Sequence, residues 1–75
     1  MGHPINTRTK LGALIVARGE PIYMWSARTR IAYSTLNEYV RGVRPIPHHH
    51  LLRLTEAFDV EPEELIGLNE NAYDT

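Results

Sequence analysis

The chain has 75 residues, a formal net charge of −1 and no cysteine. This length allows one small domain with a thin core, and without cysteine neither a disulfide framework nor a cysteine-containing zinc site can stabilise it. No hydrophobic run is long enough to span a membrane and no apolar signal region is evident, so we expect an intracellular, cytoplasmic protein with no membrane partner.

The first predicted helix follows a loose arm at residues 1–6 and covers about 7–18. Asn6 or Thr7 is placed to cap its N-terminus, and Gly19 is placed to end it. Hydrophobic residues recur at the three- and four-residue spacing of one helix face. The residues that we expect this face to bury are Leu11, Leu14 and Ile15.

A second helix is predicted over 21–28. Pro21 lies at its start, where the missing N–H group has no cost. We expect Trp25 to be a core residue between the first three helices rather than a platform for a ligand. Ile22 or Met24 would be buried beside it.

The third predicted helix, 32–41, has two distinct faces. The hydrophobic face, at helical spacing, consists of Leu36, Tyr39 and Val40. The opposite face carries hydrogen-bonding groups and almost no aliphatic surface, and its members are Tyr33, Ser34, Asn37, Glu38 and Arg41. Gly42 is placed to end the helix in a left-handed conformation. Two short helices, a tight turn and a polar face on the second helix have the geometry that presents side chains to the major groove of DNA.

The remainder of the chain is predicted to be an extended link, two more helices and a tail. The link precedes a fourth helix over 47–58, and Pro62 opens a fifth helix over 62–67. The tail is expected over 69–75. The core residues expected from the fourth helix are Leu51, Leu54 and either Phe58 or Ala57.

The charge is divided unevenly along the chain. Residues 1–44 carry seven Lys or Arg and two Glu, for a net charge of +5. Residues 45–75 carry one Arg and seven Asp or Glu, for a net charge of −6. We therefore expect a basic half that suits a polyanionic partner and an acidic half that faces away from it.

Residues from about 11 to 67 resemble the lambda repressor/Cro-type helix-turn-helix family, also called the XRE family. Ser26 is small where the family brings two helices close together, and Trp25 and Ile31 stand at its apolar positions. The segments STLNEYVRG, RPIP and LLRLTEAFDVEPEELIG resemble the end of its recognition helix, the link that follows, and its last two helices. The resemblance implies an all-α, compact five-helix domain over 7–68 that binds double-stranded DNA.

Position by position, the resemblance places base-reading side chains on the 32–41 helix. Glu38 would accept a hydrogen bond from cytosine, and Asn37 would read adenine. Arg41 and Arg44 would hold phosphates and fix the register. An alternative is that Glu38 pairs with Arg41 or Arg30 on the protein surface. The complete set of expected DNA-binding residues is Tyr33, Ser34, Thr35, Asn37, Glu38, Arg41, Arg44 and Arg30.

The chain departs from the family pattern at several positions. Ile22 replaces a glutamine that holds a phosphate. Arg30 replaces a turn glycine, so either Arg30 carries a left-handed strain of about 1 kcal/mol or the turn is built differently. Ala32 replaces a capping serine or threonine. Ile15 and Val40 replace an arginine–glutamate pair, and such apolar replacement is often neutral for stability.

Metal binding, cofactors and catalysis are not expected from this sequence. His48, His49 and His50 are adjacent on a helix, so their side chains point about 100° apart and cannot converge on one ion. We expect two of them to be solvated and one to pack at the helix start. No glycine-rich phosphate loop or metal-site motif is present, so we do not expect an enzyme.

The sequence therefore predicts a small DNA-binding transcriptional regulator, such as a Cro-like or compact repressor of phage or bacterial type. It would act as a homodimer on a palindromic operator, with its dimer surface at the fifth helix and tail and no small-molecule effector. The competing hypothesis is a protein-interaction module or antitoxin that keeps the fold with weak or no DNA binding. The acidic half and the missing glutamine favour that alternative.

Overall fold

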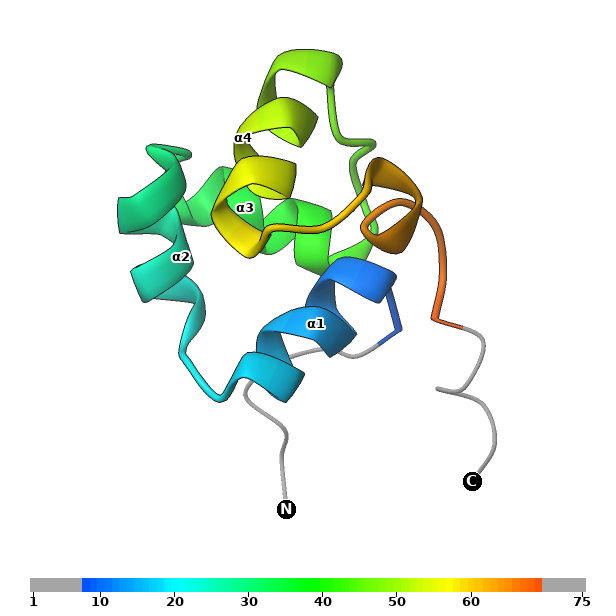
Figure 1. Ribbon diagram of the computed structural model, residues 1–75, viewed down its shortest axis with the longest axis horizontal. Coiled ribbons are helices and arrows are strands. Elements are labelled where there is room, and N and C mark those ends of the chain that lie inside the picture. Colours follow the sequence, from blue (N-terminus) through cyan, green and yellow to red (C-terminus); the bar gives the residue numbers. More distant parts are fainter. Residues whose placement is uncertain (1–7, 70–75) are drawn as a thin grey trace.

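The computed structural model describes residues 8–69 and is built from helices (Figure 1). Four α-helices follow one another along the chain: α1 (Lys10–Arg18), α2 (Ile22–Thr29), α3 (Tyr33–Arg41) and α4 (His48–Phe58). A single 3₁₀ turn, η1 (Pro62–Glu64), follows them. Helices α2, α3 and α4 begin and end within one residue of the ranges expected from the sequence. None of the helices in this part of the chain is long and apolar enough to cross a membrane.

Each of the four α-helices ends at a residue with left-handed backbone geometry. Glycine occupies this position after α1 and α3, where Gly19 has φ 74° and Gly42 has φ 77°. Arg30 ends α2 with φ 61° and Asp59 ends α4 with φ 59°. A left-handed residue lets its N–H group bond back to the last turn, so the chain can leave the helix sharply.

The first helix starts later than the sequence predicted. Thr9 is its N-cap, and the Thr9 hydroxyl accepts a hydrogen bond from the Gly12 N–H group at 2.9 Å. The expected start near residue 7 is wrong because residues 8–10 pair instead with residues 67–69, through an antiparallel bridge between Thr9 and Leu68. The predicted arm and its two candidate caps lie outside the described residues, as do residues 70–75 of the predicted tail.

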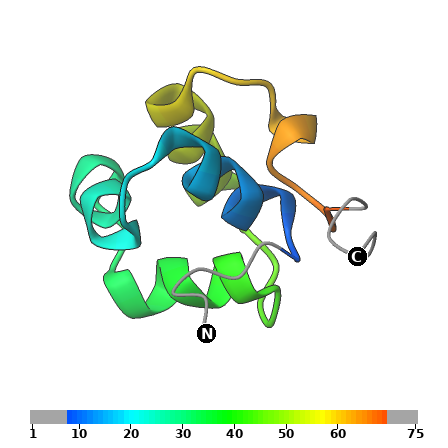
Figure 2. The same cartoon turned by 90° about the horizontal axis from the view of Figure 1, so that it is seen from below.

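The predicted fifth helix is also different in the structure. Instead of an α-helix over 62–67, the chain makes the 3₁₀ turn η1 and then turns away at Gly67, which has φ 99°. The side chain of Glu64 accepts a hydrogen bond from the Glu61 N–H group, which caps the turn at its start. The segment therefore continues to Leu68 beside the start of α1 (Figure 2).

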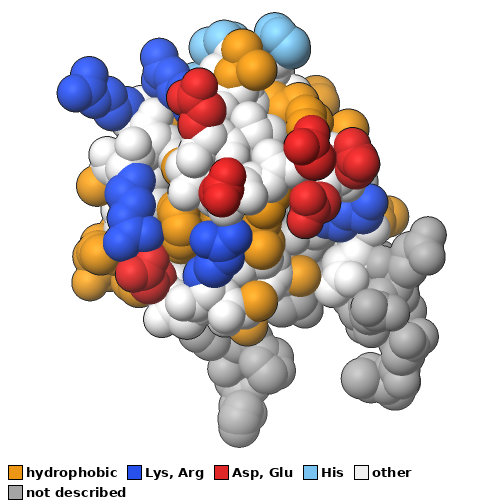
Figure 3. Space-filling view, viewed as in Figure 1, with side chains coloured by type: hydrophobic (Ala, Val, Ile, Leu, Met, Phe, Trp, Pro, Cys, Tyr) orange, Lys and Arg blue, Asp and Glu red, His pale blue; other side chains and the backbone are white. Residues whose placement is uncertain are grey.

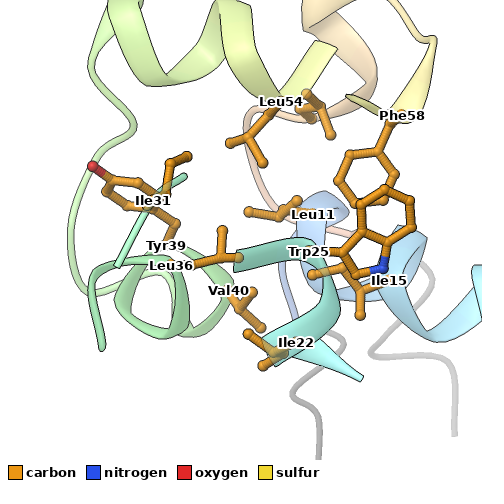
Figure 4. Close-up of a cluster of buried hydrophobic side chains, with 11 residues drawn as sticks. Leu11, Ile15, Ile22, Trp25, Ile31, Leu36, Tyr39, Val40, Leu54 and Phe58 are labelled. Carbon is orange, nitrogen blue, oxygen red and sulfur yellow. The ribbon is translucent and has the colours of Figure 1, made fainter. Parts of the chain in front are cut away.

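The core lies where all of these elements meet (Figure 4). Helix α3 packs against α1 and α2, α2 packs against α4, and α4 contacts η1. The buried hydrophobic residues are Leu11, Ile15, Ile22, Trp25, Ile31, Leu36, Tyr39, Val40, Leu54, Phe58 and Leu65. Leu14, Leu51 and Ala57 are only partly buried and pack against this cluster.

Trp25 is a core residue, but its main neighbour comes from α4. Its ring stacks on Phe58 with centroids 3.9 Å apart and an angle of 16° between the planes. The guanidinium of Arg28 also lies over the indole ring, and that of Arg18 lies over the Phe58 ring. The sequence placed Trp25 between the first three helices, and the structure adds a contact with α4, because the stack joins α2 to α4.

Candidate nucleic-acid interface

Helix α3 forms one edge of the molecule, with the other helices on a single side of it (Figure 2). Its buried residues are Leu36, Tyr39 and Val40, the three that the periodicity assigned to the core. Tyr33 and Ser34 in its first turn are exposed, whereas Thr35, Asn37 and Glu38 are half-buried. The helix therefore presents a polar side to solvent that is widest at its N-terminal end.

The turn between α2 and α3 is held by hydrogen bonds to the backbone. The Ser26 hydroxyl donates to the Ile31 carbonyl at 2.6 Å, and the Arg30 N–H group donates to the Ser26 carbonyl at 2.9 Å. Arg53 of α4 donates to the Arg30 carbonyl at 3.2 Å. The left-handed conformation expected at Arg30 is therefore present, and it leaves the Arg30 side chain exposed. Ala32 offers no side-chain cap to α3.

Two arginines follow the polar face at the end of α3. Arg41 and Arg44 are both exposed. The Nε atom of Arg44 lies 2.9 Å from Oε1 of Glu38, an ion pair that the Gly42 turn makes possible. The partner of Glu38 is therefore Arg44, and not Arg41 or Arg30 as the sequence suggested. Glu38 lies on the polar side of α3, but one of its carboxylate oxygens already has Arg44 as a cationic partner.

A second link runs from α3 to the start of α4. The Tyr39 hydroxyl lies 2.7 Å from Nδ1 of His50, and the two rings meet edge to face. Burial raises the pKa of Tyr39, and Glu38 raises it further while Arg44 lowers it. Burial also lowers the pKa of His50, and the nearby cationic groups of His49 and Arg53 lower it further. Both shifts favour neutral rings at this contact.

The three histidines differ in their exposure to solvent. His48 and His49 are exposed, and His50 is half-buried against Tyr39. This is the division expected from the sequence, with one ring packed at the helix start. Within residues 8–69 no group of three His, Asp or Glu side chains is arranged to hold a metal ion.

Thr9 is a residue whose importance the sequence analysis missed. Its hydroxyl donates to the Val40 carbonyl at 2.6 Å, so it joins the cap of α1 to the last turn of α3. A Cβ atom at Gly42 would lie 3.0 Å from the Thr9 methyl group, so this close approach and the positive φ both require glycine there. A threonine two residues before Leu11, the first hydrophobic residue of the helix, was the available signal for the cap, but nothing local indicated its contact with α3.

The acidic side chains gather on another face. Those of α4 and η1 appear in a view in which α3 lies behind (Figures 1 and 3). The acidic residues of this region are Glu56, Asp59, Glu61, Glu63 and Glu64, all exposed. Basic side chains lie among them on this face (Figure 3), so the charge division of the sequence is only partly a division in space.

The structure places all eight predicted site residues on α3, on the turn before it or on the link after it. No family model, curated protein or solved structure matches the chain. The arrangement of the side chains is therefore the basis for any functional conclusion.

Proposed function

We propose that this chain is a helix-turn-helix domain that binds double-stranded DNA and regulates transcription. In this proposal α2, the turn at Arg30 and α3 form the motif, and α3 enters the major groove. The observation that carries the proposal is the continuous polar side of α3, which faces solvent while its other side is buried in the core. A helix with this division can contact a polar partner on its open side without disturbing the core.

The residues of the interface would divide the work by position. Tyr33, Ser34 and Asn37 would face base edges from the N-terminal half of α3. Arg41 and Arg44 would contact phosphates at its other end, and Arg30 would do so from the turn. Thr35 would lie near the DNA backbone. Glu38 would either accept a hydrogen bond from cytosine or orient Arg44.

Binding to a random duplex pool at low salt tests this proposal, followed by selection and sequencing of the bound duplexes. Ser34→Glu should weaken binding by about tenfold or more, because it places a negative charge among phosphates. Ala17→Glu adds the same charge at an exposed position on α1 and should change binding far less. Equal losses in the two variants would show that α3 is not the contacting element.

The competing function is a protein-interaction module that binds no DNA. Absence of binding to any duplex at low salt, with a folded protein by circular dichroism, would support that alternative. Binding without sequence preference after selection would support a DNA-binding protein that is not an operator-specific regulator.

A further inference from the structure

Histidine and arginine side chains gather where the first part of α4 meets the turn before α3. Arg53 of α4 donates to the Arg30 carbonyl at 3.2 Å, so its guanidinium is held at that turn. His49 and Arg53 are four residues apart in one helix, which places them on the same face of α4. The ring centroids of His49 and His50 are 4.2 Å apart. Histidine side chains lie beside Lys or Arg side chains at the end of the molecule where α4 begins (Figures 1 and 3).

This cluster of Arg30, Arg53 and His49 is exposed and has no acidic partner within residues 8–69. The two ion pairs in that part of the chain involve other arginines. The acidic residue of α4, Glu56, is three positions after Arg53, and no ion pair joins the two. Positive groups that the fold holds close together repel one another and attract an anion. The cluster is therefore a candidate site for an anionic group.

The cluster lies at the N-terminal end of α3. Arg30 is three residues before Tyr33, where α3 begins, whereas Arg41 and Arg44 lie at and beyond its other end. The nine residues of α3 give it a length of about 13 Å. The major groove of DNA is about 12 Å wide and has a phosphate backbone on each side. A helix of this length that lies across the groove brings one cationic group near each backbone.

The two neighbouring histidines differ in how readily they can gain a charge. His50 is half-buried, its Nδ1 atom lies 2.7 Å from the Tyr39 hydroxyl, and its pKa is lowered first by burial and then by its cationic neighbours on α4. His49 is exposed and can take up a proton without bringing a charge into the core. The charged or titratable groups around the two rings are Arg53 on α4, Arg30 in the turn, and Tyr39, Glu38 and Arg44 on α3 and the link after it.

We propose that this cluster binds a phosphate of the DNA backbone and makes DNA binding depend on pH. Arg30 and Arg53 would hold the phosphate, and His49 would take up a proton beside it. A nearby negative charge favours the protonated imidazole, and histidine changes its charge between about pH 5 and 8. Proton and DNA therefore strengthen the binding of each other, so DNA affinity rises as the pH falls. The inference rests on the proposed function and adds regulation by pH to the same interface.

The pH dependence of DNA affinity tests this proposal. In fluorescence anisotropy with one duplex at constant salt, the parent chain should bind about threefold or more tightly at about pH 6.5 than at about pH 8. His49→Gln should lose most of this gain. His48→Gln removes the adjacent ring, whose direction from the helix differs by about 100°, and should keep the gain. A parent chain with the same affinity at both pH values overturns the proposal, as does the same pH dependence in the two variants.

The salt dependence of DNA affinity tests the role of Arg53. Arg53→Gln should reduce the slope of log affinity against log salt by about one unit, and Arg53→Lys, which keeps the charge, should retain the slope. Arg18→Gln is a matched control, because Arg18 also donates to a backbone carbonyl, that of Phe58 at 2.6 Å, but lies at the end of α1. Circular dichroism checks that each variant is folded. Equal slopes in Arg53→Gln and Arg18→Gln would show that Arg53 supports the turn and binds no phosphate.

Failure of this site and failure of the proposed function are distinguishable. A parent chain that binds duplex DNA with an affinity independent of pH overturns the site alone, whereas a parent chain that binds no duplex contradicts the proposed function. Titration with inorganic phosphate, followed through the NMR signals of the His49 ring, separates two sources of phosphate. Saturable binding of inorganic phosphate together with a duplex affinity independent of pH would assign the cluster to free phosphate and overturn the contact with DNA.

Discussion

Glu38 is the residue whose chemistry depends most on its neighbour. Its carboxylate and the Arg44 guanidinium are both partly exposed, so their ion pair adds at most about 1 kcal/mol to stability. Its larger effect is geometric, because it engages Nε and leaves the terminal nitrogens of Arg44 for another acceptor. The structure therefore gives Glu38 a role in positioning Arg44, which the sequence alone did not indicate.

A double-mutant cycle on DNA binding tests this positioning role. Glu38→Gln and Arg44→Gln should each weaken DNA binding. The binding free energy lost by the double variant should be smaller than the sum of the two single losses, by about 0.5 kcal/mol or more. Fluorescence anisotropy with the selected duplex gives the three affinity differences. Additive losses together with a changed base preference at one position in Glu38→Gln would instead show direct reading of a base by Glu38.

His50 gives stability a dependence on pH. Because its pKa is lowered in the folded state, the unfolded chain takes up the proton first as pH falls. Stability is therefore full above the ordinary histidine pKa of about 6.5 and declines as pH falls below it, until the folded form is also protonated. His50→Gln should reduce this decline, whereas His48→Gln, at an exposed position, should not. Urea denaturation at several pH values above and below the ordinary histidine pKa measures this decline in stability. If stability depends on pH in the same way in both variants, His50 is not its source.

At the scale of the elements, the turns after α2 and α4 share an unusual backbone. Arg30 and Asp59 both adopt the left-handed conformation without being glycine. Each is held by its place between two helices and by the N–H bond to the preceding turn, Arg30 to Ser26 and Asp59 to Thr55. Local sequence preference alone would place glycine at both positions.

Replacing each residue by glycine separates strain from function. Arg30→Gly and Asp59→Gly should each raise the free energy of unfolding by about 1 kcal/mol or less, because the strain exceeds the added freedom of the unfolded chain. Only Arg30→Gly should weaken DNA binding, because Asp59 follows α4, and the chain after α4 lies away from α3 (Figure 2). Thermal denaturation measures the stability of each variant, and fluorescence anisotropy measures its DNA affinity. If Arg30→Gly and Asp59→Gly bind DNA equally well, Arg30 is not part of the interface.

At the scale of the whole molecule, the uneven charge of the sequence is only partly a division between faces. The face seen in Figure 3 carries the acidic side chains of α4 and η1 together with several Lys and Arg side chains. Arg41 and Arg44 are exposed at the end of α3 and in the link after it. A cluster of positive charge at that site would attract a polyanion even though the net charge of the chain is −1.

The salt dependence of DNA affinity reports the number of phosphate contacts. Arg41→Ala should reduce the slope of log affinity against log salt by about one unit and weaken all duplexes alike. Lys10→Ala removes the same charge at a side chain that contacts the Glu63 carbonyl, and it should leave the slope unchanged. A changed sequence preference with an unchanged slope in Arg41→Ala would mean that Arg41 reads bases.

The sequence by itself determined the positions of α2, α3 and α4 and the two sides of α3. These features follow from local rules, because a hydrophobic period near 3.6 and glycine or proline at the ends depend only on near neighbours. The same rules failed at both ends of the domain, where residues 8–10 pair with residues 67–69 in place of a longer α1 and a fifth helix.

Only the tertiary structure decided which side chains meet. Thr9 bonds to Val40 across 31 residues, Trp25 stacks on Phe58, and Tyr39 contacts His50. The bridge between Thr9 and Leu68 likewise joins the two ends of the domain. Such contacts depend on how helices cross and where the chain returns, and no local pattern in a single sequence encodes those distances.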